Sequence, residues 1–238
     1  MEGFSIVDIY ETKGAEYLFV IGYLLILIIF WRLMRNPGKT LRQIKDAVSI
    51  LSAKILKIPQ GIYFNKNHTW AHLGESGAAR VGVDDFLQHI IGDLQFSGLK
   101  EVGDSIKQGE ILAEIQQNGK HLKVYSPISG QVLETNTLLT DNPEVINEDP
   151  YQKGWLYQIK PSHWRKETSS FLLGEEASVW SEKELTRFKD FLSMGAMQKY
   201  SADPAMVTLQ DGGEIRDHVM SELPEEVWME FQQEFLNE

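Results

Sequence analysis

An uncharged apolar run near the N-terminus constrains this chain more than any other feature. The run YLFVIGYLLILIIFW covers residues 17–31 and contains no acidic or basic side chain. With the residues up to 34 it approaches the roughly 20 residues that a helix needs to cross a bilayer. Tyr17 and Trp31 stand at its ends, where aromatic side chains favour the membrane–water interface, and Arg32 can extend its charge toward the headgroups. We therefore predict a transmembrane helix over 17–34.

The charges on either side of the run indicate that it is retained and predict its orientation. A cleaved signal peptide has basic residues before its apolar run and small residues after it. Here acidic residues dominate before the run and five cations follow it, Arg32, Arg35, Lys39, Arg42 and Lys45. The same cations disfavour a buried core helix. By the positive-inside rule, residues 1–16 form a short extracytoplasmic N-terminus and the main domain is cytoplasmic, in a single-pass protein of the inner membrane. The predicted anchor residues are Tyr17, Trp31, Arg32 and Arg35.

A second periodic segment follows over 35–60. Its apolar residues recur at spacings of three and four, as in an amphipathic helix, at Leu41, Ile44, Val48, Leu51 and Ile55. We predict a connector helix here. It can pack on a neighbouring element, or its cationic start can lie against anionic headgroups.

From residue 61 the pattern changes to short strand-like runs separated by turn residues. The runs ARVGV, LAEIQQ, HLKVYSP, GQVLE and WLYQI are separated by glycine, asparagine and aspartate. This pattern predicts a small all-β sandwich or barrel-like sheet. The stretch DDFLQHIIG interrupts it as a short helix, with Asp84 as the N-terminal cap and Gly92 at its end.

Residues 61–164 resemble the glycine cleavage system H protein family, which is related to lipoyl domains. Four stretches carry the resemblance: HTWAHLGESGAARVGVDDF, IGDLQFSGLKEVGDSIKQGE, YSPISGQVLETNTLL and NPEVINEDPYQKGWLYQIKPS. The resemblance implies a flattened β-sandwich of two sheets, a barrel-sandwich hybrid, with a lipoyl-bearing lysine at the tip of a hairpin. The lipoyl group of the family carries an aminomethyl group between enzymes, so the cofactor supplies the chemistry. The expected fold class is therefore mainly β, with one transmembrane helix before the sandwich and an α-helical extension after it.

The hairpin IQQNGKHLKVYSP departs from the family at the cofactor position. The family's lipoyl lysine lies six residues before the tyrosine of a Tyr-Ser-Pro motif. That tyrosine is Tyr125 here, so the resemblance places Gly119 at the lysine position. The acidic residues that flank the lysine in the family are also missing, since Gln116, Gln117 and Lys123 occupy those neighbourhoods.

The residues at the tip favour a tight turn instead. The Asn-Gly pair at 118–119 favours a two-residue type I′ turn. Lys120 follows the turn one position out of register, and a shift of one residue moves a side chain to the other face of a strand. We predict an unmodified hairpin with no cofactor. Lipoate on Lys120 is the alternative.

Other candidate sites are better explained by structural roles. The chain has no cysteine, which excludes disulfides, thiolate metal sites and a cysteine nucleophile. His68 and His72 are four apart, but on a strand such residues lie roughly 13 Å apart, too far to share a metal ion. Glu148 and Asp149 are expected to stabilise a turn. We predict no catalytic residue and no metal site, and the net charge of −11 argues against nucleic acid as a partner.

Residues 165–238 are predicted to form an acidic helical extension. Residues 171–238 contain 15 acidic and 5 basic residues, a balance of −10. Ser181 and Glu184 have the spacing of a capping box, and Pro224 suits the first turn of a final helix. That helix has an apolar stripe of one valine and three aromatic residues, Val227, Trp228, Phe231 and Phe235, which we call the aromatic stripe. The stripe can cover part of the β-domain or bind a groove on a partner subunit, which makes these four the candidate partner-binding residues.

Two functional hypotheses follow. The first is a non-catalytic subunit, tethered to the bilayer, that holds other protein subunits in a membrane complex; a redox or respiratory complex is suggested by analogy alone. The second is a membrane-localised lipoyl carrier of glycine-cleavage type that is modified on Lys120. A sensor domain that binds free lipoate or a metabolite in the hairpin groove is a third possibility that no residue favours.

Overall fold

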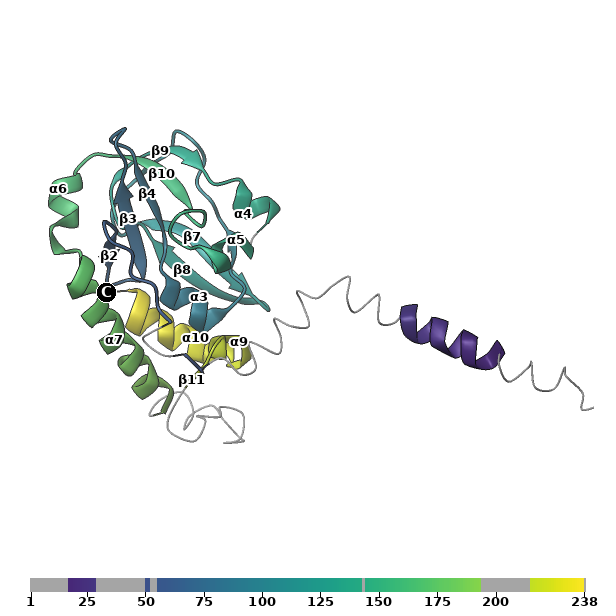
Figure 1. Cartoon of the computed structure of the whole chain (residues 1–238). Helices are drawn as coiled ribbons and strands as arrows, with labels where there is room; N and C mark the ends of the chain where they lie inside the picture. The colour runs from purple at the N-terminus through teal and green to yellow at the C-terminus, as the bar shows by residue number, and fades with distance from the viewer. Residues whose placement is uncertain (1–16, 29–49, 52–54, 143, 194–214, 238) are drawn as a thin grey trace, which may run out of the picture. The chain divides into compact units, whose positions relative to one another are not determined.

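The computed structural model of the chain (Figure 1) describes residues 17–28, 50–51, 55–142, 144–193 and 215–237. These residues belong to two units, Met1–Val48 and Ser49–Glu238. In the first unit residues 17–28 form a helix whose apolar side chains are mostly exposed. Within the described parts of the chain, no helix has the length and apolarity needed to cross a membrane. Residues 29–34 of the predicted span lie outside the described residues, as do Trp31, Arg32 and Arg35.

The second unit is built on two larger β-sheets, which confirms the mainly β sandwich expected from the sequence. The six-stranded sheet has the order β2-β3-β4-β10-β9-β6 and the three-stranded sheet the order β5-β7-β8. Their bounds are β2 Tyr63–Asn65, β3 Thr69–Leu73, β4 Ala79–Val83, β10 Tyr157–Pro161, β9 Gly130–Thr135, β6 Ser105–Ile106, β5 Gln95–Ser97, β7 Ile111–Gln117 and β8 Lys120–Tyr125. Apolar side chains of both sheets share one core, for example Val81, Ile159, Ile115 and Leu122.

A short helix, α3 (Asp85–Ile91), connects β4 to β5 and is capped as the sequence predicts. The Asp84 carboxylate accepts a hydrogen bond from the backbone N–H of Leu87 at 3.1 Å. Gly92 ends the helix with a φ of +94°, a conformation that favours glycine. Two further short helices, α4 (Leu138–Asp141) and α5 (Glu144–Glu148), precede β10.

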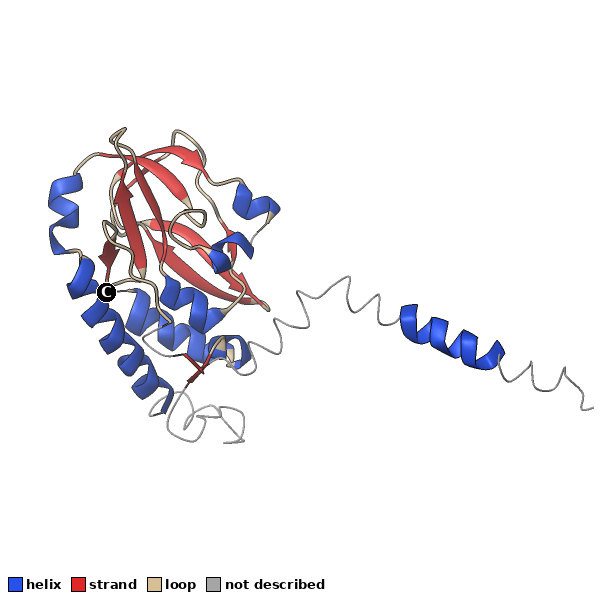
Figure 2. Ribbon diagram, viewed as in Figure 1, coloured by secondary structure: helices blue, strands red, loops and turns tan. Residues whose placement is uncertain are grey.

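Helices predominate after β10. They are α6 (Trp164–Glu167), the 3-10 turn η1 (Thr168–Ser170), α7 (Gly174–Phe191), α9 (Val219–Glu222), α10 (Glu225–Phe231) and the π-helical turn η3 (Gln232–Leu236). Figure 2 shows α7, α9 and α10 gathered at one end of the sheets, and α9 contacts α3 while α10 and η3 contact β8. We call residues 215–236 the C-terminal segment.

The connector helix predicted over 35–60 is corrected where the structure describes it. Residues 50–51 form a strand, β1, which pairs with β11 (Ile215–Arg216) in a two-stranded sheet, and residues 55–60 contain no helix. Leu51 is fully buried. The apolar spacing was compatible with a helix, but pairing with a segment about 160 residues away is not readable from a local pattern. Residues 35–49 and 52–54 lie outside the described residues.

The predicted capping box in the extension is also wrong. Ser181 and Glu184 lie in the middle of α7, which begins at Gly174, and both are buried. Glu184 contacts a buried histidine rather than a helix end, as described below. The last helix begins close to the expected residue, since Pro224 is the N-cap of α10.

Candidate functional site at the hairpin tip

The tip of the β7–β8 hairpin is a two-residue turn. Asn118 and Gly119 both have positive φ, +51° and +79°, as a type I′ turn requires, and Gln117 pairs with Lys120 across the turn. No atom lies within 4 Å of the position that a Cβ of Gly119 would occupy. The position that the resemblance assigns to the lipoyl lysine is therefore an open glycine, and Lys120 is the first residue of the following strand.

The Lys120 ammonium is bound by the C-terminal segment. Its Nζ donates to the backbone carbonyls of Ser221 at 2.8 Å and Leu223 at 2.7 Å, and lies 3.5 Å from that of Met220. The indole ring of Trp228 covers the ammonium, with 5.0 Å between Nζ and the ring centroid. Burial lowers the pKa of Lys120, whereas the carbonyls and the ring favour its charged form. Lys120 thus acts as a structural cation beneath the C-terminal segment.

A second contact covers the outer edge of β8. The backbone N–H of Lys123 donates to Oε1 of Gln232 at 2.6 Å, and Nε2 of Gln232 donates to the Lys123 carbonyl at 3.3 Å. The side-chain amide of Gln232 therefore replaces a neighbouring strand at this position. Such pairing satisfies an edge strand that would otherwise expose its hydrogen-bonding groups.

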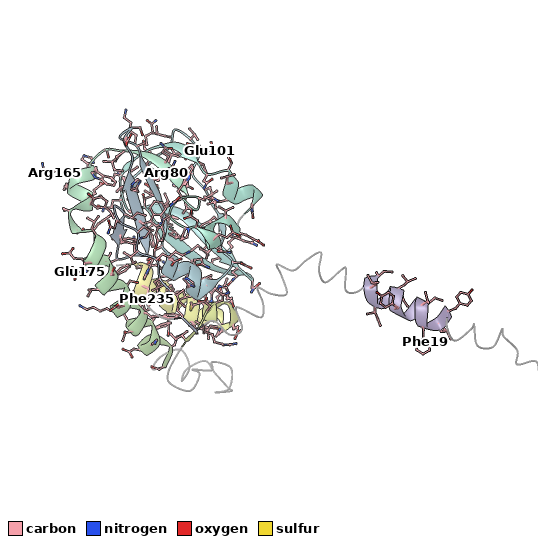
Figure 3. All side chains as sticks on the ribbon, viewed as in Figure 1. Phe19, Arg80, Glu101, Arg165, Glu175 and Phe235 are labelled. Carbon is pink, nitrogen blue, oxygen red and sulfur yellow. The ribbon has the colours of Figure 1, made fainter. Side chains whose placement is uncertain are left out.

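The four candidate partner-binding residues are placed in the chain's own core. All four side chains are fully buried: Val227, Trp228, Phe231 and Phe235. The rings of Phe231 and Phe235 stack, with 4.7 Å between their centroids. Figure 3 shows Phe235 among the helices at the base of the sheets. This arrangement corresponds to the first of the two alternatives for the aromatic stripe, cover for the β-domain. These four side chains do not form an exposed docking surface.

One buried histidine joins the extension to the β-domain. His68 Nδ1 is 2.8 Å from Oδ2 of Asp84, and His68 Nε2 is 3.6 Å from Oε1 of Glu184 on α7. Burial alone would lower the pKa of His68, but the two carboxylates outweigh it and raise the pKa to about 9. The imidazole ring also stacks on Phe86 at 4.4 Å between ring centroids. His68 is therefore a protonated core residue at neutral pH.

A second histidine, His89, also lies between two carboxylates. His89 Nδ1 is 2.9 Å from Oδ1 of Asp217 in the C-terminal segment, and its Nε2 is 3.6 Å from Oδ2 of Asp85. Burial lowers the pKa of His89, but Asp217 and Asp85 raise it overall. Asp84 and Asp85 thus each pair with a histidine that reaches a carboxylate of the extension.

The structure also places the other candidate residues, and Glu148, which was expected to stabilise a turn, is the last residue of α5. His68 precedes β3 and His72 lies on it, where His72 is exposed, and the described residues contain no group of three side chains able to hold a metal ion. Asp149 stabilises a turn, because its Oδ1 accepts from the backbone N–H groups of Tyr151 and Gln152. Sequence reasoning missed Gln232, Asp217 and the pairing of His68 with Glu184. The sequence predicted Asp84 only as a helix cap, and no local pattern indicated its pairing with His68.

Comparison with known proteins decides the family. The family model of the glycine cleavage H-protein matches residues 62–184, just over half of the chain. The chain belongs to the glycine cleavage H-protein family. The chain is 40% identical over 120 residues to a probable glycine cleavage system H protein of Pyrococcus abyssi, covering 50% of this chain and 89% of that relative. It is 41% identical over 107 residues to the glycine cleavage system H protein of Coprothermobacter proteolyticus, covering 45% of this chain and 84% of the relative.

The chain is also similar to a solved structure. The glycine cleavage system H protein of Mycobacterium marinum matches with 30% sequence identity and a TM-score of 0.44, over 53% of this chain and 98% of that one. The H-protein-family match ends within α7. The C-terminal segment, which binds Lys120 and the edge of β8, therefore lies beyond the matched residues.

Proposed function

We propose that this H-protein-family chain is a non-catalytic, non-lipoylated subunit that is tethered to the inner membrane and holds partner proteins in a membrane complex. The observation that carries the proposal is the binding of the Lys120 ammonium by the Ser221 and Leu223 carbonyls and by the Trp228 ring. A carrier lysine has to move between partner active sites, whereas the Lys120 ammonium is held by two carbonyls and an aromatic ring.

The burial of the C-terminal segment argues against a readily released lysine. The four side chains of the aromatic stripe are fully buried. Exposing an apolar side chain of this size costs about 1.5–3 kcal/mol, so exposing all four costs roughly 6–12 kcal/mol. That range is comparable to the whole free energy of unfolding of a typical domain, about 5–15 kcal/mol. Release of Lys120 by undocking this segment would therefore be rare.

A lipoyl carrier modified on Lys120 is the second candidate function. The family membership favours it, because the relatives are named as glycine cleavage system H proteins. The out-of-register position of Lys120 and its contacts favour the first proposal. The two differ in a measurable way, the presence of an amide-linked acyl group on Lys120.

The cofactor experiment is intact-protein mass spectrometry of the full chain from a lipoylating host supplied with lipoate. We expect the unmodified mass. A lipoyl adduct that disappears in Lys120→Arg would establish the carrier function instead. Lys123→Arg is the matched control, because the Lys123 side chain is exposed on the same strand.

The membrane tether and the partners need separate tests. The chain has no cysteine, so single cysteines report topology cleanly. An impermeant maleimide should label Ser5→Cys in intact cells and should label Ser162→Cys only after permeabilisation. Purification of the tagged full chain in mild detergent should recover other subunits, and their identity would show whether the complex is redox or respiratory. A solitary monomer, or extraction of the chain by carbonate, would contradict this proposal.

A further inference from the structure

A second candidate site lies at the opposite end of the sheets from the C-terminal segment. A cleft there is lined by β6, by the start of β9, by the end of β10 and by the residues that lead into α6. In Figure 1 α6 and β9 lie at the upper end of the sandwich, whereas α9 and α10 lie at the lower end. The cleft shares no residue with the surroundings of Lys120.

Strand register places polar side chains in rows on one wall of this cleft. Ser105 pairs with Gln131, and Gln131 pairs with Lys160, so these three exposed residues form a row across three strands. Lys107, Ser129 and Ser162 each lie one residue beyond the end of one of these strands, and all three also line the cleft. We call these three residues the second row.

Backbone contacts orient the hydroxyl groups of the second row. Ser129 Oγ accepts from the backbone N–H of Gln108 at 2.9 Å, which leaves its own proton free to donate. The backbone N–H of Ser162 donates to the Ser129 carbonyl at 3.0 Å, and Ser162 Oγ is 3.0 Å from Nδ1 of His163. Gly130 has no side chain, and a Cβ there would clash with the Lys160 carbonyl oxygen. The backbones of β9 and β10 therefore approach too closely at this position for any residue but glycine.

The charge at this cleft is opposite to that of the whole chain. Lys107 and Lys160 both line it, and within the described residues neither ammonium forms a salt bridge, although the backbone hydrogen bond of Lys107, and to a smaller extent its charge, contribute to lowering the pKa of the exposed Glu110 carboxyl. The single carboxylate in the lining, that of Glu167, accepts a hydrogen bond from the backbone N–H of Ser129 at 2.7 Å. Arg165 and Lys166 follow on α6, and Figure 3 shows Arg165 at the outer margin of the molecule. The lining of this cleft thus has two lysines and one carboxylate, in a chain whose net charge is −11.

We propose that this cleft binds a phosphoryl group. Two lysine ammoniums and serine hydroxyls donate hydrogen bonds, and lysine binds phosphate as a point charge. A group with several anionic oxygens satisfies donors on both rows at once, whereas a neutral ligand would leave the ammoniums uncompensated. The cleft is open to solvent, so the phosphoryl group can belong to free phosphate or to a phospholipid headgroup.

The test uses the full chain and one matched pair of double variants. Lys107→Gln with Lys160→Gln removes both cations of the cleft. Lys123→Gln with Lys153→Gln makes the same change in net charge at two exposed lysines outside it. Isothermal titration with inorganic phosphate is done on protein in neutral detergent. Hydrogen exchange over residues 105–108 and 160–166 is then compared in nanodiscs of phosphatidylcholine with and without phosphatidic acid.

Each outcome decides the proposal. Saturable phosphate binding that is at least tenfold weaker in the cleft variant and unchanged in the control supports a site for free phosphate. Protection that requires phosphatidic acid and is lost only in the cleft variant supports a headgroup site. Equal behaviour of the two variants overturns the proposal, and so does the absence of both phosphate binding and lipid-dependent protection. None of these readouts depends on Lys120, so the proposed function is tested separately.

Discussion

The ring of Trp228 lies over the ammonium of Lys120, with 5.0 Å between Nζ and the ring centroid. The indole N–H of Trp228 donates at 2.8 Å to the Met220 carbonyl, which itself lies 3.5 Å from Lys120 Nζ. One aromatic residue from beyond the family match therefore both covers the hairpin lysine and orients a carbonyl beside it. This pair connects the H-protein fold to the extension.

Removing the lysine charge should weaken the docking of the C-terminal segment. Lys120→Met keeps an unbranched apolar stem but loses the hydrogen bonds to the Ser221 and Leu223 carbonyls. Hydrogen bonds to charged groups contribute about 1.5–3 kcal/mol each at most, and part is recovered by water, so we expect a loss of roughly 1–3 kcal/mol in the free energy of unfolding. Urea denaturation measures it. Lys123→Met should change stability by less than about 0.5 kcal/mol, and equal effects of the two variants would contradict the structural role of Lys120.

Truncating Trp228 should lower the free energy of unfolding more than Lys120→Met does. Trp228 is fully buried, so Trp228→Ala is expected to lower the free energy of unfolding by about 3–5 kcal/mol. Trp228→Phe keeps most of the apolar volume but leaves the Met220 carbonyl without the indole donor, and we expect a smaller loss. Met229→Ala is the control, because the Met229 side chain is exposed on the same helix. A Trp228→Ala variant as stable as this control would mean that the segment is not docked in solution.

Stability should fall as the pH rises toward 9. His68 has a folded-state pKa of about 9 against about 6.5 when unfolded. A group whose pKa is raised on folding stabilises fully below its unfolded pKa, and its contribution is lost as the pH rises through the folded value. The shift corresponds to a contribution on the order of 3 kcal/mol that declines between about pH 6.5 and 9. The pKa of His89 is also raised in the folded state, so its contribution to stability is likewise lost as the pH rises.

Urea titrations at several pH values check this dependence. His68→Asn should flatten the fall in stability between pH 6.5 and 9, because asparagine tolerates the left-handed backbone at this position, where φ is +59°. His72→Asn is the control at an exposed histidine and should retain the wild-type slope. An unchanged slope in His68→Asn would mean that the imidazole is not charged in the folded state.

Restoring a lysine at the glycine of the turn should restore modification. Gly119→Lys places a side chain at an open position with no atom within 4 Å of its Cβ. The positive φ of +79° should cost about 1–2 kcal/mol, which the folded domain can tolerate. We expect a lipoyl adduct in a lipoylating host, detected by intact mass. Gly119→Arg carries the same strain and charge without an acceptor amine, and an unmodified Gly119→Lys would show that other departures at the tip block the lipoylating enzyme.

Local patterns were sufficient for several elements of the fold. The Asn118–Gly119 turn was predicted because a type I′ turn requires positive φ at both residues, and both have it. The α3 helix was predicted from Asp84 and Gly92, since capping depends on neighbours in the chain. The same reasoning failed at Ser181 and Glu184, where a capping-box spacing occurs inside a longer helix whose start at Gly174 lacks a capping side chain.

The sequence by itself determined the H-protein sandwich, and it predicted both the register that puts Gly119 at the cofactor position and a tether over the apolar run. Alternation, turn chemistry and charge order are local, and each can be read from neighbouring residues. The tertiary structure alone decided where the aromatic stripe packs, and that Lys120, His68 and His89 bind groups of the extension. Lys120 and Leu223 are 103 positions apart, and no local pattern specifies which buried charge meets which distant carbonyl. Which charge meets which carbonyl depends on how the whole core packs, because that packing brings the two segments together.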